Sequence, residues 1–169
     1  MPIRNDLNQV RETIGEFELA AEARFQEGSD LVLHSKTRYA GVYILGYSAE
    51  MFLKCSVFRF MSMKTDDLIR DCLTDKDRYL KKNQILPQAP HENNHSLRYW
   101  SEILLKMRDW EDKRLVKTLE TDLLFHSEAI YDNWWVEMRY KSIEIKGADT
   151  ETMRQSCAWM SYHYDRLWR

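Results

Sequence analysis

The stretch that most constrains the fold is RYAGVYILGYSAEMFLKCSVFRFM, Arg38 to Met61, the most apolar part of the chain. It is nearly long enough to span a bilayer, but Glu50, Lys54 and Arg59 would be costly inside a membrane. Apolar side chains occupy most of its sides, as expected for a helix that several neighbours cover. We therefore predict a buried core helix over about residues 38–63 and no membrane span.

The composition favours a helical protein of one domain. A chain of 169 residues with few Gly (5) and Pro (3) fits a single domain, 1–169, that is rich in helix. The net charge of −2 does not indicate nucleic-acid binding by the chain as a whole, although the sequence is compatible with a local basic surface.

The cysteines and the start of the chain indicate a compartment. Three cysteines without a CxxC spacing argue against disulfides and zinc, which favours a cytoplasmic location. The first residues, MPIRNDLNQVRETIGEF, lack the apolar core of a signal peptide.

Periodicity and capping signals place the other helices. We expect a helix over about 13–35, in which Gly28 allows a kink or a close approach, and a short helix in TDDLIRDCL capped by Thr65 or Asp66. Asn94 or Ser96 should cap a third long helix, and a fourth should run over about residues 110–131. Asp149 should cap the last helix. The segment WWVEMRY breaks the period and fits an extended or tightly turned connection. The prediction is an all-α, up-and-down bundle of about five helices.

The order of these features resembles the HEPN domain family of helical, nucleotide-binding domains. RYAGVYILGYSAEMFLKC is similar to the family's second helix with its GYxxExxLK core, HSL at His95–Leu97 to its HxL element, and WWVEMRY to an Arg-Tyr element after the fourth helix. The resemblance covers about residues 17–169. It implies a HEPN-like bundle, a homodimer, and a toxin–antitoxin or defence setting, in some relatives beside a nucleotidyltransferase.

The sequence departs from the pattern of the catalytic members. HEPN ribonucleases carry an Arg followed four to six residues later by a His, and no such pair occurs here. Arg139 has no His at that distance, and the step from Arg154 to His163 is too long. The usual metal-independent RNA cleavage is therefore not expected.

Glu50 and Lys54 lie one turn apart and share a helix face with Tyr43 and Tyr47. The simplest interpretation is a solvated salt bridge on the only wet stripe of the helix. The alternative is a polar network in a cleft or dimer seam, with Arg139 as the partner of Glu50. A catalytic role for Glu50 is a third interpretation.

The segment WWVEMRY supplies the other binding candidates. Trp135, Glu137, Arg139 and Tyr140 could stack on bases and contact phosphate. The alternative is that Trp134 and Trp135 pack on the end of the bundle while Glu137 and Arg139 hold the loop.

The histidines give weaker candidates. His91 and His95 have the spacing of a metal pair, but they lie in a loop rich in Pro and Asn, so we predict no metal site and no cofactor. His95 should be a helix-start residue that bonds a backbone carbonyl or a neighbouring helix. His126 lies on an apolar stripe and is more typical of a satisfied core histidine than of a base.

Three functions follow from these residues. The preferred one is a dimeric HEPN-like module that binds nucleotide, RNA or a protein partner without nuclease activity. The first alternative is a metal-independent endoribonuclease in which Arg139 steadies the phosphate while His95 or His126 transfers protons. The second alternative is a structural subunit of a larger complex.

Overall fold

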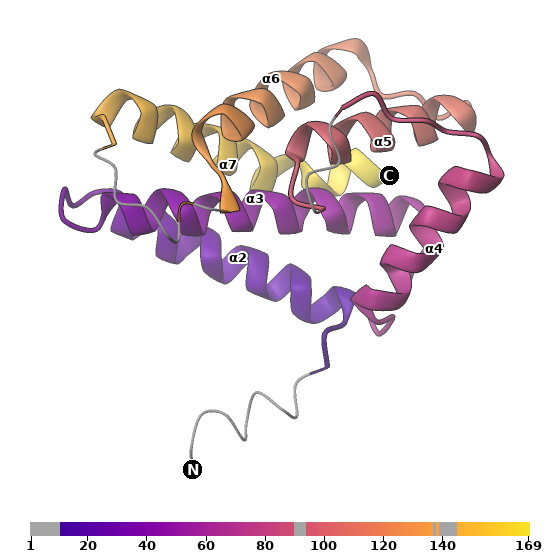
Figure 1. Cartoon of the computed structure of the whole chain (residues 1–169), viewed down its shortest axis with the longest axis horizontal. Coiled ribbons are helices and arrows are strands. Elements are labelled where there is room, and N and C mark those ends of the chain that lie inside the picture. The colour runs from indigo at the N-terminus through magenta and orange to yellow at the C-terminus, as the bar shows by residue number, and fades with distance from the viewer. Residues whose placement is uncertain (1–10, 90–93, 137, 139–144) are drawn as a thin grey trace.

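The described part of the chain is a bundle of helices. The computed structural model describes residues 11–89, 94–136, 138 and 145–169. These residues form six helices and no strand, apart from an isolated bridge between Thr13 and Leu68. The all-α prediction is confirmed (Figure 1). The helices are α2 (Ile14–Leu31), α3 (Arg38–Phe60), α4 (Ile69–Lys82), α5 (Leu97–Trp110), α6 (Lys117–Asn133) and α7 (Gly147–Trp168).

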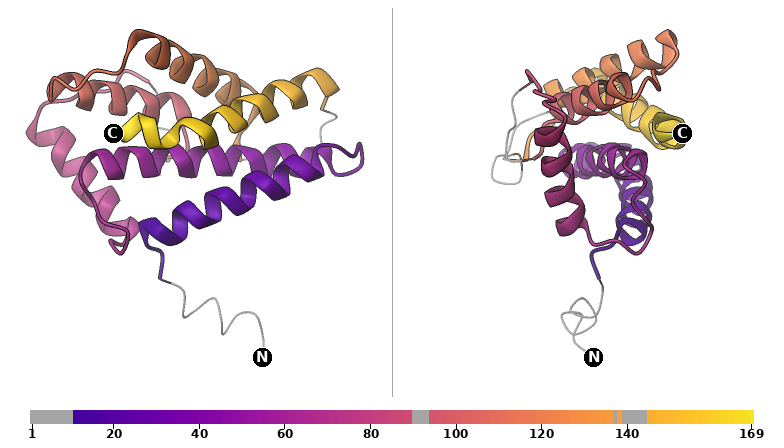
Figure 2. Two further views of the ribbon diagram at one scale, coloured as in Figure 1. Left: turned by 180° about the vertical axis from the view of Figure 1, so that it is seen from behind. Right: turned by 90° about the vertical axis from the view of Figure 1, so that its right-hand side faces the viewer.

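Helix α3 is the central helix, as its apolar sequence predicts. It packs on α2 on one side and on α5 and α7 on the other, while α6 packs on α5 and α7 (Figure 2). Leu45, Ala49, Leu53 and Phe58 have no exposed surface. No helix of the described ranges is long and apolar enough to cross a membrane.

Helices α2 and α3 make a close backbone contact at two glycines. A Cβ on Gly28 would lie 3.0 Å from the backbone nitrogen of Leu45, and one on Gly41 would lie 2.7 Å from that of Val32. Larger residues would force the helices apart. The close approach expected at Gly28 is confirmed.

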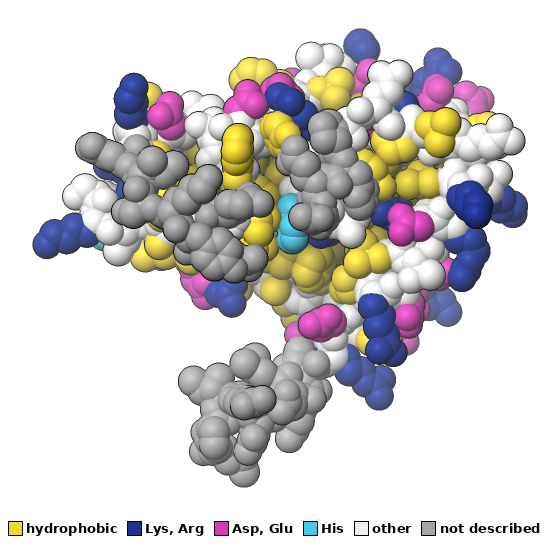
Figure 3. Space-filling model, in the orientation of Figure 1, with side chains coloured by type: hydrophobic (Ala, Val, Ile, Leu, Met, Phe, Trp, Pro, Cys, Tyr) yellow, Lys and Arg dark blue, Asp and Glu magenta, His cyan; other side chains and the backbone are white. Residues whose placement is uncertain are grey.

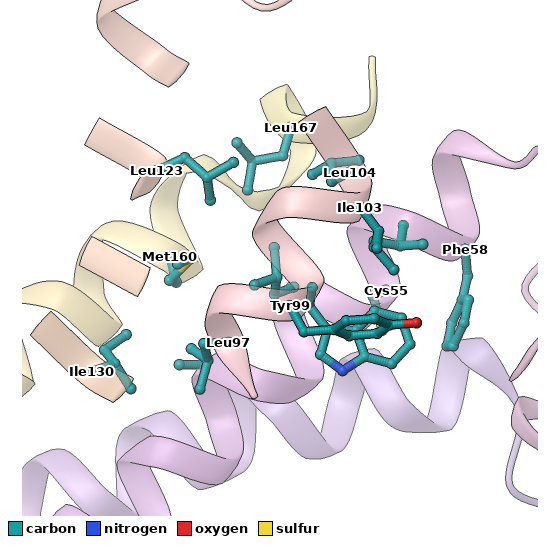
Figure 4. Close-up of a cluster of buried hydrophobic side chains, with 14 of the residues drawn as sticks. Cys55, Phe58, Leu97, Tyr99, Ile103, Leu104, Leu123, Ile130, Met160 and Leu167 are labelled. Atoms are coloured by element: carbon teal, nitrogen blue, oxygen red, sulfur yellow. The ribbon is translucent and has the colours of Figure 1, made fainter. Parts of the chain in front are cut away.

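The apolar stripes of α5, α6 and α7 meet above α3. Leu97, Ile103 and Leu104 from α5 are fully buried, as are Ile130 from α6 and Met160 from α7. Figure 4 shows these side chains converging from the three helices. Burial of such stripes supplies most of the stability of helices of this length.

Several predicted helix ends are wrong. Helix α5 continues to Trp110, and the left-handed φ of 53° at Asp112 separates it from α6. Neither Thr65 nor Asp66 caps α4, whose N-cap is Leu68. The hydroxyl of Thr65 instead accepts from Arg59 Nη2 at 3.0 Å, and its carbonyl accepts from Gly15 N at 2.8 Å.

The predicted N-cap is right for α5 and wrong for α7. Ser96 is the N-cap of α5, as expected, and its hydroxyl accepts from Tyr99 N at 3.2 Å. Helix α7 begins at Gly147 after Lys146, so Asp149 lies in its first turn and does not cap it. An acid in that turn still interacts favourably with the helix dipole.

Candidate functional site

Glu50 and Lys54 form a buried ion pair in the middle of α3. Glu50 is 3% exposed and Lys54 is 7% exposed, so the prediction of a solvated salt bridge is wrong. The Lys54 ammonium donates to Glu50 Oε1 one turn away and lies 5.2 Å from the centre of the Trp100 ring. The pair is buried because α5 covers this side of α3, which the sequence of α3 alone does not reveal.

His95 completes this network. Its Nδ1 lies 3.1 Å from Glu50 Oε1 and 2.9 Å from Oε2. An ionised carboxylate can only accept, so Nδ1 carries the hydrogen and Nε2 is the acceptor of the neutral ring. The expectation that His95 bonds a neighbouring helix is confirmed.

The other side of the imidazole is accessible. The side chain of His95 is 35% exposed, and its Nε2 has no hydrogen-bond partner in the described part of the chain. The backbone holds the ring in place, because Ser96 caps α5 on one side and the Asn94 carbonyl accepts from Trp100 Nε1 at 2.9 Å on the other. The ring is therefore fixed through Nδ1, and part of its surface is exposed.

A second buried ammonium lies behind the network. Lys76 of α4 has no exposed surface, and its Nζ lies 3.2 Å from Tyr99 Oη, 2.9 Å from Asp77 Oδ1 and 4.7 Å from the centre of the Trp100 ring. Trp100 therefore contacts the ammonium groups of both Lys54 and Lys76. Cation–π contacts of this kind are strongest where water is excluded.

Aromatic rings line the approach to His95. The Tyr47 ring lies 6.3 Å from the His95 ring, 5.0 Å from Tyr43 and 5.2 Å from Trp134, in each case edge to face. The hydroxyl oxygens of Tyr43 and Tyr47 are 3.2 Å apart. We call Tyr43, Tyr47, Glu50, Lys54, His95 and Trp134 the His95 site.

Gly46 makes room for one of these rings. A Cβ on Gly46 would lie 2.0 Å from Trp134 Cγ, and the indole N–H of Trp134 donates to the Tyr43 carbonyl at 2.9 Å. The space that the missing side chain leaves at Gly46 is therefore filled by an indole from another segment.

The WWVEMRY segment contributes two tryptophans with different environments. Trp134 is 2% exposed and packs on α3, whereas Trp135 is 58% exposed and donates to the Tyr131 carbonyl at 3.1 Å. Glu137, Arg139 and Tyr140 lie outside the described residues, so the expected pairing of Arg139 with Glu50 is not tested.

His126 belongs to a different cluster. Its Nδ1 lies 3.1 Å from Ser156 Oγ, and its ring stacks on Trp159 with centres 4.7 Å apart. Burial lowers the pKa of His126, Asp122 opposes this shift, and His163 adds to it. The structure thus makes His126 a satisfied histidine between α6 and α7, as predicted, and joins only His95 to Glu50.

Sequence spacing could not predict that His95 lies on Glu50. Glu50 and His95 are 45 residues apart, and no periodic pattern connects them. The buried contacts of Lys76 with Trp100 were not foreseen, because a lysine in a charged helix is normally solvated.

An exposed histidine side chain lies in the middle of one face of the molecule, beside hydrophobic side chains (Figure 3). Over the described ranges, no group of three or more His, Cys, Asp or Glu side chains could hold a metal ion. A scan against protein-family models gives no match, and searches of curated proteins and of solved structures give none either.

Proposed function

We propose that the chain is a HEPN-like helical module that binds nucleotide or RNA at the His95 site, without the usual HEPN nuclease activity. The observation that carries the proposal is the partly exposed imidazole of His95, held through Nδ1 by the buried Glu50–Lys54 pair. The resemblance of helix α3 to the second HEPN helix supports the same assignment.

The energetics of the pair support a role beyond stability. A buried ion pair is often no more stabilising than apolar side chains of the same volume, because both charges lose their water. Here the pair orients an imidazole that is itself partly exposed. A buried polar network that costs desolvation and ends at a partly exposed side chain is a candidate functional site.

The chemistry of the site suits a phosphorylated ligand with an aromatic base. A protonated His95 can donate from Nε2 to a phosphate oxygen in a charge-assisted hydrogen bond. The exposed indole of Trp135 offers a ring on which a base can stack.

Binding can be measured by fluorescence anisotropy with a short labelled single-stranded RNA in EDTA. We expect His95→Ala to weaken binding by about tenfold, the effect of losing one charge-assisted hydrogen bond. His34→Ala is the matched control, because His34 is exposed in the connection between α2 and α3. Equal binding by the His95→Ala variant and the wild type would contradict the proposal.

A specific observation also favours an acid–base function as a second candidate. A carboxylate that holds Nδ1–H leaves Nε2 as a general base, the arrangement that orients catalytic histidines in many enzymes. On this hypothesis the protein cleaves RNA without metal, with His95 transferring the proton and Arg139 steadying the phosphate. RNA that stays intact at high protein concentration removes this candidate, whereas cleavage lost in both His95→Ala and Glu50→Gln supports it.

The proposal includes a homodimer, and a nucleotidyltransferase-type or other protein partner remains an expectation from the resemblance. Light scattering after size-exclusion chromatography measures the mass directly. A monomer at all concentrations would remove the dimer from the proposal and leave the His95 site unaffected.

A further inference from the structure

Five aromatic rings on α6 and α7 form a continuous row at the surface of the bundle. Their order is Phe125, His126, Trp159, His163 and Tyr162, with neighbouring ring centres 5.1, 4.7, 4.6 and 4.9 Å apart. Phe125 is 64% exposed and Tyr162 is 79% exposed, whereas the three rings between them are partly buried. We call these five residues the aromatic face.

The aromatic face is held in place by the packing of α6 on α7. The two helices lie side by side and run in opposite directions (Figure 1), and α7 is the front helix when the molecule is seen from behind (Figure 2). His126 Nδ1 lies 3.1 Å from Ser156 Oγ of α7, and His163 Nδ1 donates to the Trp159 carbonyl at 3.0 Å. A surface fixed in this way avoids the entropic cost of ordering its side chains on binding.

The exposed area of this face fits a second copy of the chain. An aromatic side chain buries about 150–250 Å², so the exposed fractions of Phe125 and Tyr162 amount to about 300 Å². Apolar patches of this size on a single molecule often mark an interface. In a pair of copies these four rings would bury about 600 Å², more than half of the roughly 1,000 Å² that a specific interface needs. The partly buried rings and the side chains around them add to this area.

The charges beside the aromatic face are complementary to those of a second copy. Asp122 of α6 and Arg166 of α7 are exposed, and each lies one helical turn from the exposed ring of its own helix. Neither forms an ion pair within the described residues, whereas the nearby Arg169 pairs with Asp165 at 3.0 Å. A two-fold axis parallel to the helices lays α6 of one copy on α7 of the other, which brings opposite charges together.

The register of the two helices fits this arrangement. The contacts of His126 place it level with residues 156–159 of α7, so Asp122, one turn earlier, is level with Tyr162. The side chain of Arg166 leans back toward Tyr162, because helical side chains point toward the N-terminus of their helix. Asp122 of one copy is thus within reach of Arg166 of the other, and the symmetry forms this pair twice.

We propose that the aromatic face is a homodimer interface in which α6 of one copy packs on α7 of the other. This inference rests on the homodimer that the proposed function includes, and it names the surface of that dimer. Phe125 of one copy packs against Tyr162 of the other at its centre, and the Asp122–Arg166 pairs lie at its rim. No residue of the aromatic face belongs to the His95 site, so dimerisation and RNA binding are separate properties.

Sedimentation equilibrium over a range of concentrations measures the dissociation constant of the dimer. Phe125→Ser/Tyr162→Ser should raise this constant by about a hundredfold or more, because each central aromatic anchor of an interface typically contributes tenfold or more. Leu19→Ser/Leu33→Ser is the matched control, since it replaces two apolar side chains of similar exposure, 67% and 70%, outside the aromatic face. Unchanged circular dichroism and urea denaturation would show that each variant is folded.

A charge exchange tests the orientation of the two copies. Asp122→Arg and Arg166→Asp should each weaken self-association by about tenfold, because each places like charges opposite one another twice. An equimolar mixture of the two variants should dimerise as tightly as the wild type, since each copy then faces the opposite charge on the other. A merely structural role of either residue would not produce this recovery.

The outcomes separate this interface from the proposed function. A wild-type dimer that Phe125→Ser/Tyr162→Ser weakens no more than the control does would overturn the interface alone, as would a mixture of the charge variants that fails to recover. A wild type that is monomeric at all concentrations would overturn both the interface and the homodimer. Failure of the wild type to bind labelled RNA would remove the function of the His95 site and leave the interface standing.

Discussion

Replacing Gly46 by Ala tests how the segment after α6 is held on α3. A Cβ at this position would lie 2.0 Å from Trp134 Cγ and 2.1 Å from Cδ1, distances at which the indole must move. Trp134 is 2% exposed and cannot give way without losing buried area and its bond to the Tyr43 carbonyl.

Two contributions lower the stability of the Gly46→Ala variant, and one raises it. Full exposure of an indole of 150–250 Å² would cost about 4–6 kcal/mol at 25 cal/mol per Å². The lost hydrogen bond adds about 1 kcal/mol. The better helix propensity of Ala offsets about 1 kcal/mol. Partial retention of the indole contact reduces the total, so we expect Gly46→Ala to lower the free energy of unfolding by about 3 kcal/mol.

Urea denaturation followed by circular dichroism measures this change. Gly147→Ala is the matched control, because no atom of the described residues lies within 4 Å of a Cβ at the first residue of α7. It should leave the stability unchanged or slightly raised. In a Trp134→Ala background the clash disappears, so Gly46→Ala should then be neutral or stabilising. An equal loss with and without the indole would refute the packing of Trp134 on Gly46.

Three further predictions concern the buried titratable groups. Glu50→Gln leaves the buried Lys54 ammonium without its carboxylate and should lower the free energy of unfolding by about 3 kcal/mol in urea denaturation. Glu27→Gln removes the exposed ion pair of Glu27 with Arg24 and should cost less than about 0.5 kcal/mol; equal losses would contradict the burial of the first pair. The pKa of His126 is lowered in the folded state, so the unfolded chain takes up the proton first and stability should fall as pH drops below about 6.5. His126→Gln should make this decline shallower, and an unchanged profile would exclude His126 as its source. Burial raises the thiol pKa of Cys55 and Cys157, so neither should react with a disulfide reagent in the native protein at pH 8, and all three cysteines of the chain should react in urea; rapid native labelling of either would count against this burial.

The helical class and the central place of α3 were predictable from the sequence. A run as apolar as residues 38–61 must be covered on most sides, and the 3–4 spacing of Leu97, Trp100 and Leu104 indicates a stripe that does so. Helix ends were less predictable. Thr65 has the side chain of a good cap, but its hydroxyl accepts from Arg59 of α3 instead.

The candidate site was predictable residue by residue, and its arrangement was not. The sequence alone identified Glu50 and Lys54 as charges in an apolar helix, and His95 as a residue at a helix start. It could not place His95 on Glu50, because 45 residues separate them and only the packing of α5 on α3 joins them.

The sequence by itself thus determined which segments are helical and which apolar stripes are buried, because these follow from local spacing and from the cost of exposing apolar surface. The tertiary structure alone decided which partner each buried charge acquires. A carboxylate in an apolar helix requires a donor, and lysine, histidine and arginine all satisfy that requirement chemically. Which of them reaches Glu50 depends on how distant helices pack, and in the described structure these are Lys54 and His95.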